Sequence, residues 1–190
     1  MGAAAESKGS GFTSAVTILR KMLPIDALEH VLASLSEETA QLVLHPPLPV
    51  AWIPVHHFPE LVRAVRAHAF GGDEVKFEEW GRQAILVDVR TIYKMFIRFL
   101  SPQFVIERGA KLWQTYTRNQ GNVRAEAEGP SAALVTYDGL PPELVSPEFW
   151  AYQRGVLLGV LEATGMKQIA VETLGGGATS PGARFRVSWK

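Results

Sequence analysis

Hydrophobic positions in the first two thirds of the chain recur every three or four residues, which is the spacing of one face of an α-helix. Asp73 begins the longest of these stretches, in which Phe77 and Trp80 start an apolar face that continues to about Leu100. Prolines, glycines and capping residues such as Ser36 and Ser101 separate the stretches. We therefore predict helices over residues 27–35, 36–44, 59–70, 74–100 and 101–119.

From residue 122 onward the period changes to two, which is typical of strands with one polar face. The expected strands cover residues 122–128, 131–138, 167–173 and 184–189, and a helix over 148–164 separates the two pairs. Two hairpins that flank a helix indicate an antiparallel sheet. The predicted fold class is α+β, a helical layer packed on a four-stranded antiparallel sheet, in the order helices and then β-β-α-β-β.

Composition favours one soluble domain. The chain has 190 residues, of which 47% are hydrophobic and 20% charged. Residues 1–11 are small and polar, so we expect a flexible tail there and a single domain over 12–190. Lys and Arg total 19 and so do Asp and Glu, which argues against a nucleic-acid partner held by bulk charge. No signal peptide is evident and charges interrupt the apolar stretch 84–100, so we expect no membrane span and a cytoplasmic protein.

Catalytic and metal-binding patterns are weak. The chain has no cysteine, which excludes disulfides, a thiolate nucleophile and a cysteine-based zinc site. His56 and His57, with His45 and His68 nearby, form the one histidine cluster. On an extended segment adjacent side chains point to opposite faces, and no carboxylate completes a ligand pattern. With no nucleophile elbow and no paired carboxylates either, we expect no metal ligands, no catalytic residues and no enzyme.

Three further features of the helices carry structural expectations. Gly155 and Gly159, four residues apart, predict a close approach of their helix to the sheet. Asp88 lies among apolar residues and is expected to pair with an arginine, because an unpaired buried carboxylate is costly. A basic stripe at i, i+4 and i+8 consists of Arg90, Lys94 and Arg98, and we expect it to face solvent, the alternative being contact with an acidic partner or a ligand headgroup.

Residues 155–189 resemble the end of the 4-vinyl-reductase-type domain. The matching features are Gly155, Gly159, Glu172 and the FRV of the last strand. The whole chain looks closer still to an uncharacterised bacterial family with that domain, on the segments VLASLSEE, AWIP, WGR, SPQ and LWQTY. That fold is shared with TRAPP-type trafficking subunits and, more distantly, with heme-nitric-oxide-binding domains.

The resemblance implies sites that this sequence does not complete. Relatives that sense aromatic compounds bind zinc through cysteines and a glutamate near the last hairpin, whereas here only Glu172 remains. The heme-binding branch needs an axial ligand, usually histidine. None of the five histidines matches that context.

Large aromatic residues with polar tips are the best candidates for a binding site, because they suit a pocket for a flat or apolar ligand. The candidate ligand-binding residues are Trp80, Phe104, Trp113, Tyr116, Tyr137, Phe149, Trp150 and Tyr152. We expect a non-enzymatic sensor module that binds a small apolar ligand beneath the long helix, without a cofactor. The alternatives are a dimeric protein-interaction adaptor with a filled pocket and a heme or metal sensor. The helix over 84–100 is apolar on more than one face, so we also expect a homodimer.

Overall fold

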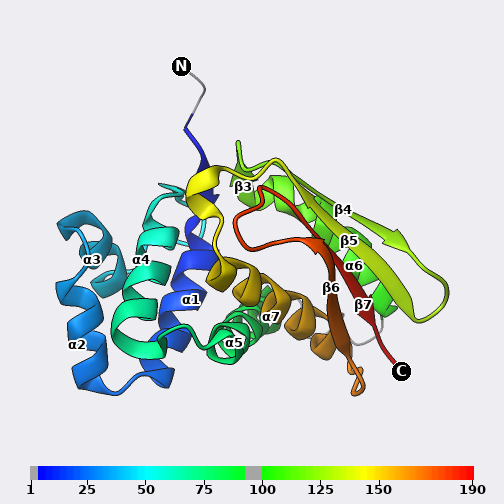
Figure 1. Ribbon diagram of the computed structural model, residues 1–190, viewed down its shortest axis with the longest axis horizontal. Helices are drawn as coiled ribbons and strands as arrows, with labels where there is room; N and C mark the ends of the chain where they lie inside the picture. The colour runs from blue at the N-terminus through cyan, green and yellow to red at the C-terminus, as the bar shows by residue number, and fades with distance from the viewer. Residues whose placement is uncertain (1–3, 93–99) are drawn as a thin grey trace.

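The computed structural model describes residues 4–92 and 100–190. A lobe of helices lies at one end of the molecule and a sheet at the other, and two long helices lie between them (Figure 1). The helices are α1 (Gly9–Met22), α2 (Ile25–Ala33), α3 (Glu37–Leu44), α4 (His57–Val65), α5 (Glu74–Ile92), α6 (Pro102–Tyr116) and α7 (Pro147–Ala163). A π-helical turn at Arg66–Phe70 extends α4, and a 3-10 turn at Pro142–Leu144 precedes α7. The strands are β1 (Glu6–Lys8), β2 (Trp52–Pro54), β3 (Thr117–Arg118), β4 (Asn122–Ala127), β5 (Ala132–Asp138), β6 (Ala170–Gly176) and β7 (Ala183–Ser188).

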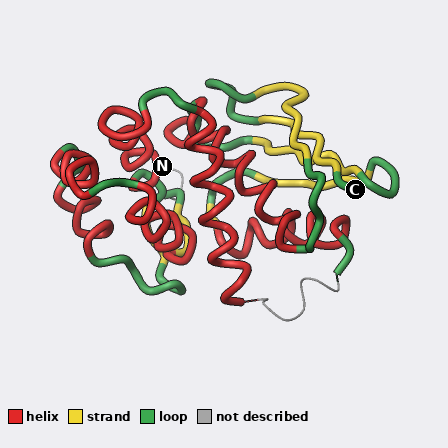
Figure 2. Tube along the Cα trace, turned by 90° about the horizontal axis from the view of Figure 1, so that it is seen from below, coloured by secondary structure: helices red, strands yellow, loops and turns green. Residues whose placement is uncertain are grey.

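The larger sheet confirms the predicted fold class. Its four strands are antiparallel in the order β4-β5-β7-β6, and α6 and α7 cover one face (Figure 2). Val135, Phe185 and Val187 face the helices and are buried. The other face is polar: Arg186 binds Glu128 at 2.8 Å. The alternation of apolar and charged residues thus places one face of each strand in the core and the other in solvent.

A second, smaller sheet was not predicted. β1 pairs with both β2 and β3, with Glu6 opposite Pro54 on one side and Arg118 on the other. Residues 6–11, expected in the flexible tail, therefore form β1 and the start of α1. The Gln120 amide donates to the Glu6 carbonyl at 2.8 Å and so holds this strand between the two halves of the chain.

Three helices begin at a serine cap, and the sequence predicts two of these caps, Ser36 and Ser101. Ser36, Ser101 and Ser146 each accept a hydrogen bond from the amide three residues on. Elsewhere the starts differ from the predicted residues 27 and 59: α2 begins at Ile25 and α4 begins at His57, each two residues earlier. No described helix is long and apolar enough to cross a membrane.

The predicted long helix is observed as α5 up to Ile92, and its expected continuation runs through residues 93–99, which lie outside the described part. Lys94 and Arg98 of the basic stripe lie there too. The homodimer expected through this stretch stays a prediction.

The glycines of α7 approach α5 and not the sheet, which corrects the expectation from the sequence. A Cβ added at Gly155 would lie 1.8 Å from the Glu78 carbonyl oxygen, and one at Gly159 would lie 2.7 Å from the Arg82 carbonyl oxygen. On α5, Gly81 faces the Tyr152 carbonyl oxygen with a corresponding distance of 2.1 Å. Small residues on both helices thus bring the two backbones into contact.

Candidate functional site

A cavity of about 560 Å³ lies between the helical lobe and the four-stranded sheet. Ala84, Ile85 and Val89 of α5 and Val156 of α7 form much of its apolar wall. α1, α6 and the inner faces of β4 and β5 complete the lining, with Phe12, Ile106 and Val135 among their contributions. The volume falls in the range of small-molecule and cofactor sites, which is roughly 300–1,000 Å³.

Six of the eight aromatic residues singled out in the sequence line this cavity. Trp113 packs edge-on against Tyr137, with ring centroids 5.7 Å apart. The six are Phe104, Trp113, Tyr116, Tyr137, Phe149 and Tyr152. They come from α6, β5 and α7, so the fold brings together residues that are far apart in the sequence.

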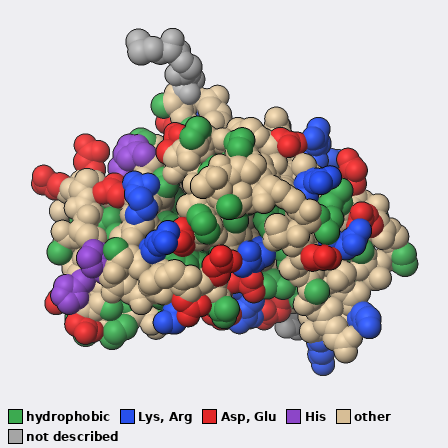
Figure 3. Space-filling model, in the orientation of Figure 1, with side chains coloured by type: hydrophobic (Ala, Val, Ile, Leu, Met, Phe, Trp, Pro, Cys, Tyr) green, Lys and Arg blue, Asp and Glu red, His purple; other side chains and the backbone are tan. Residues whose placement is uncertain are grey.

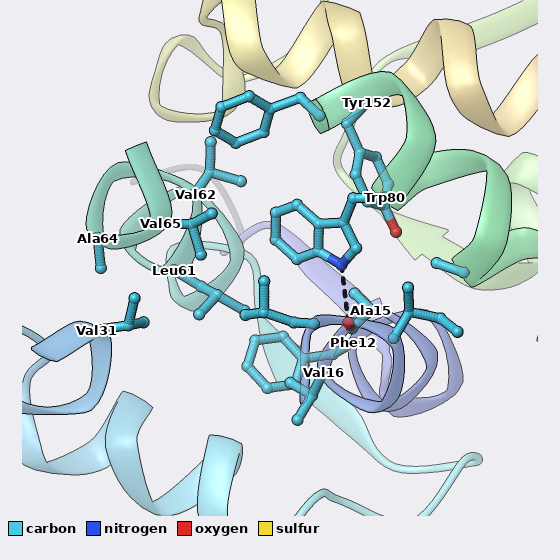
Figure 4. Close-up of a cluster of buried hydrophobic side chains, with 14 of the residues drawn as sticks. Phe12, Ala15, Val16, Val31, Leu61, Val62, Ala64, Val65, Trp80 and Tyr152 are labelled. Atoms are coloured by element: carbon cyan, nitrogen blue, oxygen red, sulfur yellow. Dashed lines mark hydrogen bonds between the residues drawn. The ribbon is translucent and has the colours of Figure 1, made fainter. Parts of the chain in front are cut away.

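The other two aromatic residues belong to the cores beside the cavity. Trp80 is fully buried among the helices, where its indole Nε1 donates to the Ala15 carbonyl at 2.8 Å (Figure 4). Trp150 is buried beside Tyr137 and Phe185 beneath the sheet. Neither residue is part of the cavity lining.

Asp88 of α5 is the acidic side chain in this lining. Its carboxylate accepts a hydrogen bond from Ser14 Oγ at 2.5 Å, and it forms no ion pair with any other described side chain. The expected arginine partner is therefore replaced by a hydroxyl from α1. Burial raises the pKa of Asp88 to about 6, while the hydrogen bond from Ser14 opposes the rise.

Among the described residues of the lining, two polar atoms are buried without a hydrogen-bond partner. They are Ser10 Oγ on α1 and Trp113 Nε1 on α6. Buried polar groups are nearly always satisfied in proteins, so each orphan calls for an explanation such as a ligand or water. The cavity thus combines an apolar body with a few polar groups, as ligand sites do.

Two cationic side chains, those of Lys8 and Arg108, lie at the edge of the cavity. Arg108 lies over the ring of Phe104, 5.2 Å from its centroid, and both side chains belong to the exposed part of α6. Lys8 lies over the ring of Tyr116 at 5.1 Å. Deeper in the cavity, burial raises the pKa of Tyr137 and Tyr152, so both phenols stay protonated at neutral pH.

The five histidines are in the helical lobe and none lines the cavity. His30, His45, His56 and His68 are exposed, and His57 is buried at the start of α4. The surface of Figure 3 shows histidines only over the helical end of the molecule, and mixed charges elsewhere on that face.

Sequence reasoning missed the contribution of the N-terminal segment, Ser7 to Phe12, to the cavity. Its small and polar residues predict a tail up to residue 11. Small residues at the start of α1 leave room for a cavity, but this is evident only once β1 is paired. The sequence places Asp88 in an apolar run, but that signal by itself predicts an ion pair and not a binding site.

No family model and no curated protein matches the sequence. Solved structures do match the fold. An H-NOX structure from work on heme distortion in that family aligns with a TM-score of 0.68 and 16% identity, over 96% of this chain and 95% of the other. An oxygen-binding H-NOX domain related to soluble guanylate cyclases aligns with a TM-score of 0.65 and 17% identity, over 96% and 95%. An H-NOX protein from K. algicida in its Fe(II) unliganded form gives 0.68 and 11%, over 96% of both chains.

These neighbours contradict the expectation that no cofactor is involved, because the solved structures that share this fold include heme proteins. They support the distant relation to heme-nitric-oxide-binding domains that the sequence suggested. At these identities the comparison concerns architecture alone: the chain has an H-NOX-like α+β fold, with helices packed on a four-stranded antiparallel sheet.

Proposed function

We propose that the chain is a sensor-type domain that binds a flat, largely apolar ligand in the cavity beneath α5, and that it performs no catalysis itself. The observation that carries the proposal is the cavity, which is large, lined by six aromatic side chains and bounded by both the helical lobe and the sheet. Similarity of fold to H-NOX domains supports a sensor role and makes heme the first ligand to test. The narrower relation to 4-vinyl-reductase-type domains is kept as part of the proposal.

The size and the apolar lining of the cavity fit a porphyrin ring. Lys8 and Arg108 at its edge are the cations that carboxylate groups of such a ligand would meet. Among described residues of the lining, the only side chains of the types that hold heme iron are tyrosines, Tyr116, Tyr137 and Tyr152. An iron porphyrin would bring a metal centre with a coordination position for a small ligand.

A phenol binds iron as phenolate, and burial opposes that ionisation for Tyr137 and Tyr152. We therefore propose that recognition of the ring by the cavity contributes more to affinity than the bond to iron. An acceptor group on the ligand would satisfy the indole Nε1 of Trp113, and a further polar group would meet Ser10.

The test is to titrate the purified chain with hemin and with iron-free protoporphyrin IX, and to follow tryptophan fluorescence and the porphyrin absorbance. We expect both to bind, with dissociation constants within about tenfold of each other, because that factor is about 1.4 kcal/mol of iron ligation. Binding of hemin alone would overturn the ring-dominated mode. If neither compound binds, heme is excluded as the ligand. If no compound of an aromatic and lipid-like panel binds either, the proposal that the cavity is a ligand site is overturned.

A matched pair of variants locates the binding site. Val123 of β4 lines the cavity, and its neighbour Arg124 points to the solvent side of the sheet. Val123→Trp fills part of the cavity and should weaken porphyrin binding at least tenfold, whereas Arg124→Trp should leave it unchanged. Equal effects of the two substitutions would place the ligand elsewhere.

The alternative of an interaction adaptor whose pocket is filled by its own side chains has less support. The described side chains leave the cavity open, and polar atoms in its lining lack partners. Unsatisfied donors in the interior of a protein cost stability, so we do not expect an adaptor with a filled pocket to retain them.

A further inference from the structure

A second group of potential ligand atoms lies outside the cavity, where the start of α4 meets α3. Glu38, His56 and His57 each place one ligand atom within 4.8 Å of the ligand atoms of the other two. The two imidazole rings lie side by side, with centroids 4.1 Å apart. The sequence indicated opposite directions for these rings and no carboxylate near them. The chain instead turns into a helix at His56 and His57, and α3 supplies Glu38.

Hydrogen bonds behind His57 fix which of its nitrogens is free. Thr39 Oγ1 lies 2.8 Å from His57 Nδ1 and donates its single proton to Glu60 Oε2 at 2.5 Å. Because the hydroxyl proton goes to Glu60, Nδ1 must carry a hydrogen and donate it to Thr39. Nε2 of His57 therefore holds a lone pair.

Glu60 is itself held in place. Its carboxylate accepts from the backbone amide of Ser36 at 2.5 Å and from the Ser36 hydroxyl at 3.1 Å. Histidines that bind metals commonly donate their second nitrogen to a carboxylate or another acceptor, which orients the ring and fixes the tautomer. The chain of His57, Thr39 and Glu60 supplies such a support through one hydroxyl.

We propose that Glu38, His56 and His57 bind one divalent transition-metal ion of the zinc class, with water in the remaining position. Two imidazoles and one carboxylate suit zinc, cobalt or nickel, whereas magnesium and calcium prefer oxygen ligands alone. His57 is 4% exposed and rigidly held, while His56 and Glu38 are exposed and able to adjust to the ion. The ion would connect α3 to α4 across the proline-rich segment between them.

The test is a titration of the full-length chain with zinc chloride by calorimetry, on the wild type and on four exposed-site variants. Glu38→Gln and His56→Gln remove a proposed ligand. Glu37→Gln and His68→Gln change an exposed carboxylate in the same turn and an exposed histidine in the same lobe, and serve as matched controls. We expect one zinc ion per chain, an affinity at least about tenfold lower for each ligand variant, and no change for the controls.

Two further readouts separate binding from folding. Zinc at a hundredfold excess over its dissociation constant should raise the melting temperature of the wild type by about 5 °C, because it binds only the folded chain, and should not do so for His56→Gln. Thr39→Val should weaken zinc binding about tenfold while circular dichroism shows that the fold is kept. Absence of binding at micromolar zinc, or equal binding by ligand variants and controls, would overturn the proposal.

Discussion

Gly155 on α7 lies directly against the carbonyl oxygen of Glu78 on α5, so closely that an added Cβ would be 1.8 Å from that oxygen. No real side chain tolerates such a distance. The oxygen belongs to the backbone of α5 and the Cβ would be bonded directly to the backbone of α7, so relief would require the two helices to move apart. Both helices contribute to the wall of the cavity, so the contact fixes part of the geometry of the site.

Replacing Gly155 by alanine should lower the free energy of unfolding by about 3 kcal/mol or more, because it overpacks a backbone contact. Urea unfolding measures the loss. Gly109→Ala is the matched control: this glycine is also helical, yet nothing lies within 4 Å of an added Cβ. The control should gain about 0.5–1 kcal/mol from helix propensity. A Gly155→Ala protein as stable as the wild type would contradict the packing described.

Arg154 holds the same pair of helices together from α7. Its guanidinium binds Glu78 at 3.0 Å and Glu74 at 2.9 Å, and its side chain is only 22% exposed. Arg154→Met keeps the apolar stem and removes both ion pairs, so we expect a loss of about 1–2 kcal/mol in the free energy of unfolding. Unfolding curves at 0.1 M and 1 M salt should show a smaller loss at high salt.

Arg124 provides the comparison for that experiment. It pairs with Asp138 at 2.5 Å on the exposed face of the sheet, with 67% of its side chain accessible. Arg124→Met should change the free energy of unfolding by no more than about 0.5 kcal/mol. A similar loss for both variants would mean that burial does not strengthen the Arg154 pairs.

Local sequence signals predict most elements of the fold, but not α1, β1, β2 or β3. Ser36 and Ser101 cap helices as expected, and β4 to β7 lie within a few residues of the predicted strands. β1 escaped prediction because three residues carry no period of their own. Its structure depends on partners at Pro54 and Arg118, far along the chain, which no local pattern reveals.

The candidate site was harder to predict because periodicity shows that a helix has an apolar face but not what the face meets. Trp80 and Trp113 look alike in the sequence, yet α5 directs the first into the helical core and α6 directs the second into the cavity. Which of them is available to a ligand depends on how α5, α6 and α7 pack. The polar members of the lining, Ser10 and Asp88, become recognisable only after that packing is known.

The two tryptophans should therefore respond differently to substitution by phenylalanine. Trp80→Phe removes the hydrogen bond to Ala15 and leaves a buried carbonyl with one partner fewer, so we expect a loss of about 1–3 kcal/mol in the free energy of unfolding. Trp113→Phe removes an indole Nε1 that has no partner, and should leave stability nearly unchanged. Porphyrin titrations should show the reverse order. Trp113→Phe should bind porphyrin more weakly than the wild type, whereas Trp80→Phe should bind it with unchanged affinity.

Asp88 should make the stability of the domain depend on pH. Its pKa is raised from the ordinary 3.8 to about 6 in the folded chain, chiefly by burial, so the native state holds this proton more tightly than the unfolded state. Below about pH 4 the carboxyl is protonated in both states, so the cost of ionising it in the fold is absent. As the pH rises from about 4 to about 6, this cost appears and the free energy of unfolding falls. The full difference corresponds to about 3 kcal/mol, an upper value because the carboxyl is partly solvated.

Asp88→Asn keeps an acceptor for Ser14 without the charge. We expect this variant to be more stable than the wild type at pH 7.5 and equally stable at pH 4, as measured by urea unfolding at both values. An unchanged difference between the two proteins across this range would show that Asp88 stays ionised in the fold.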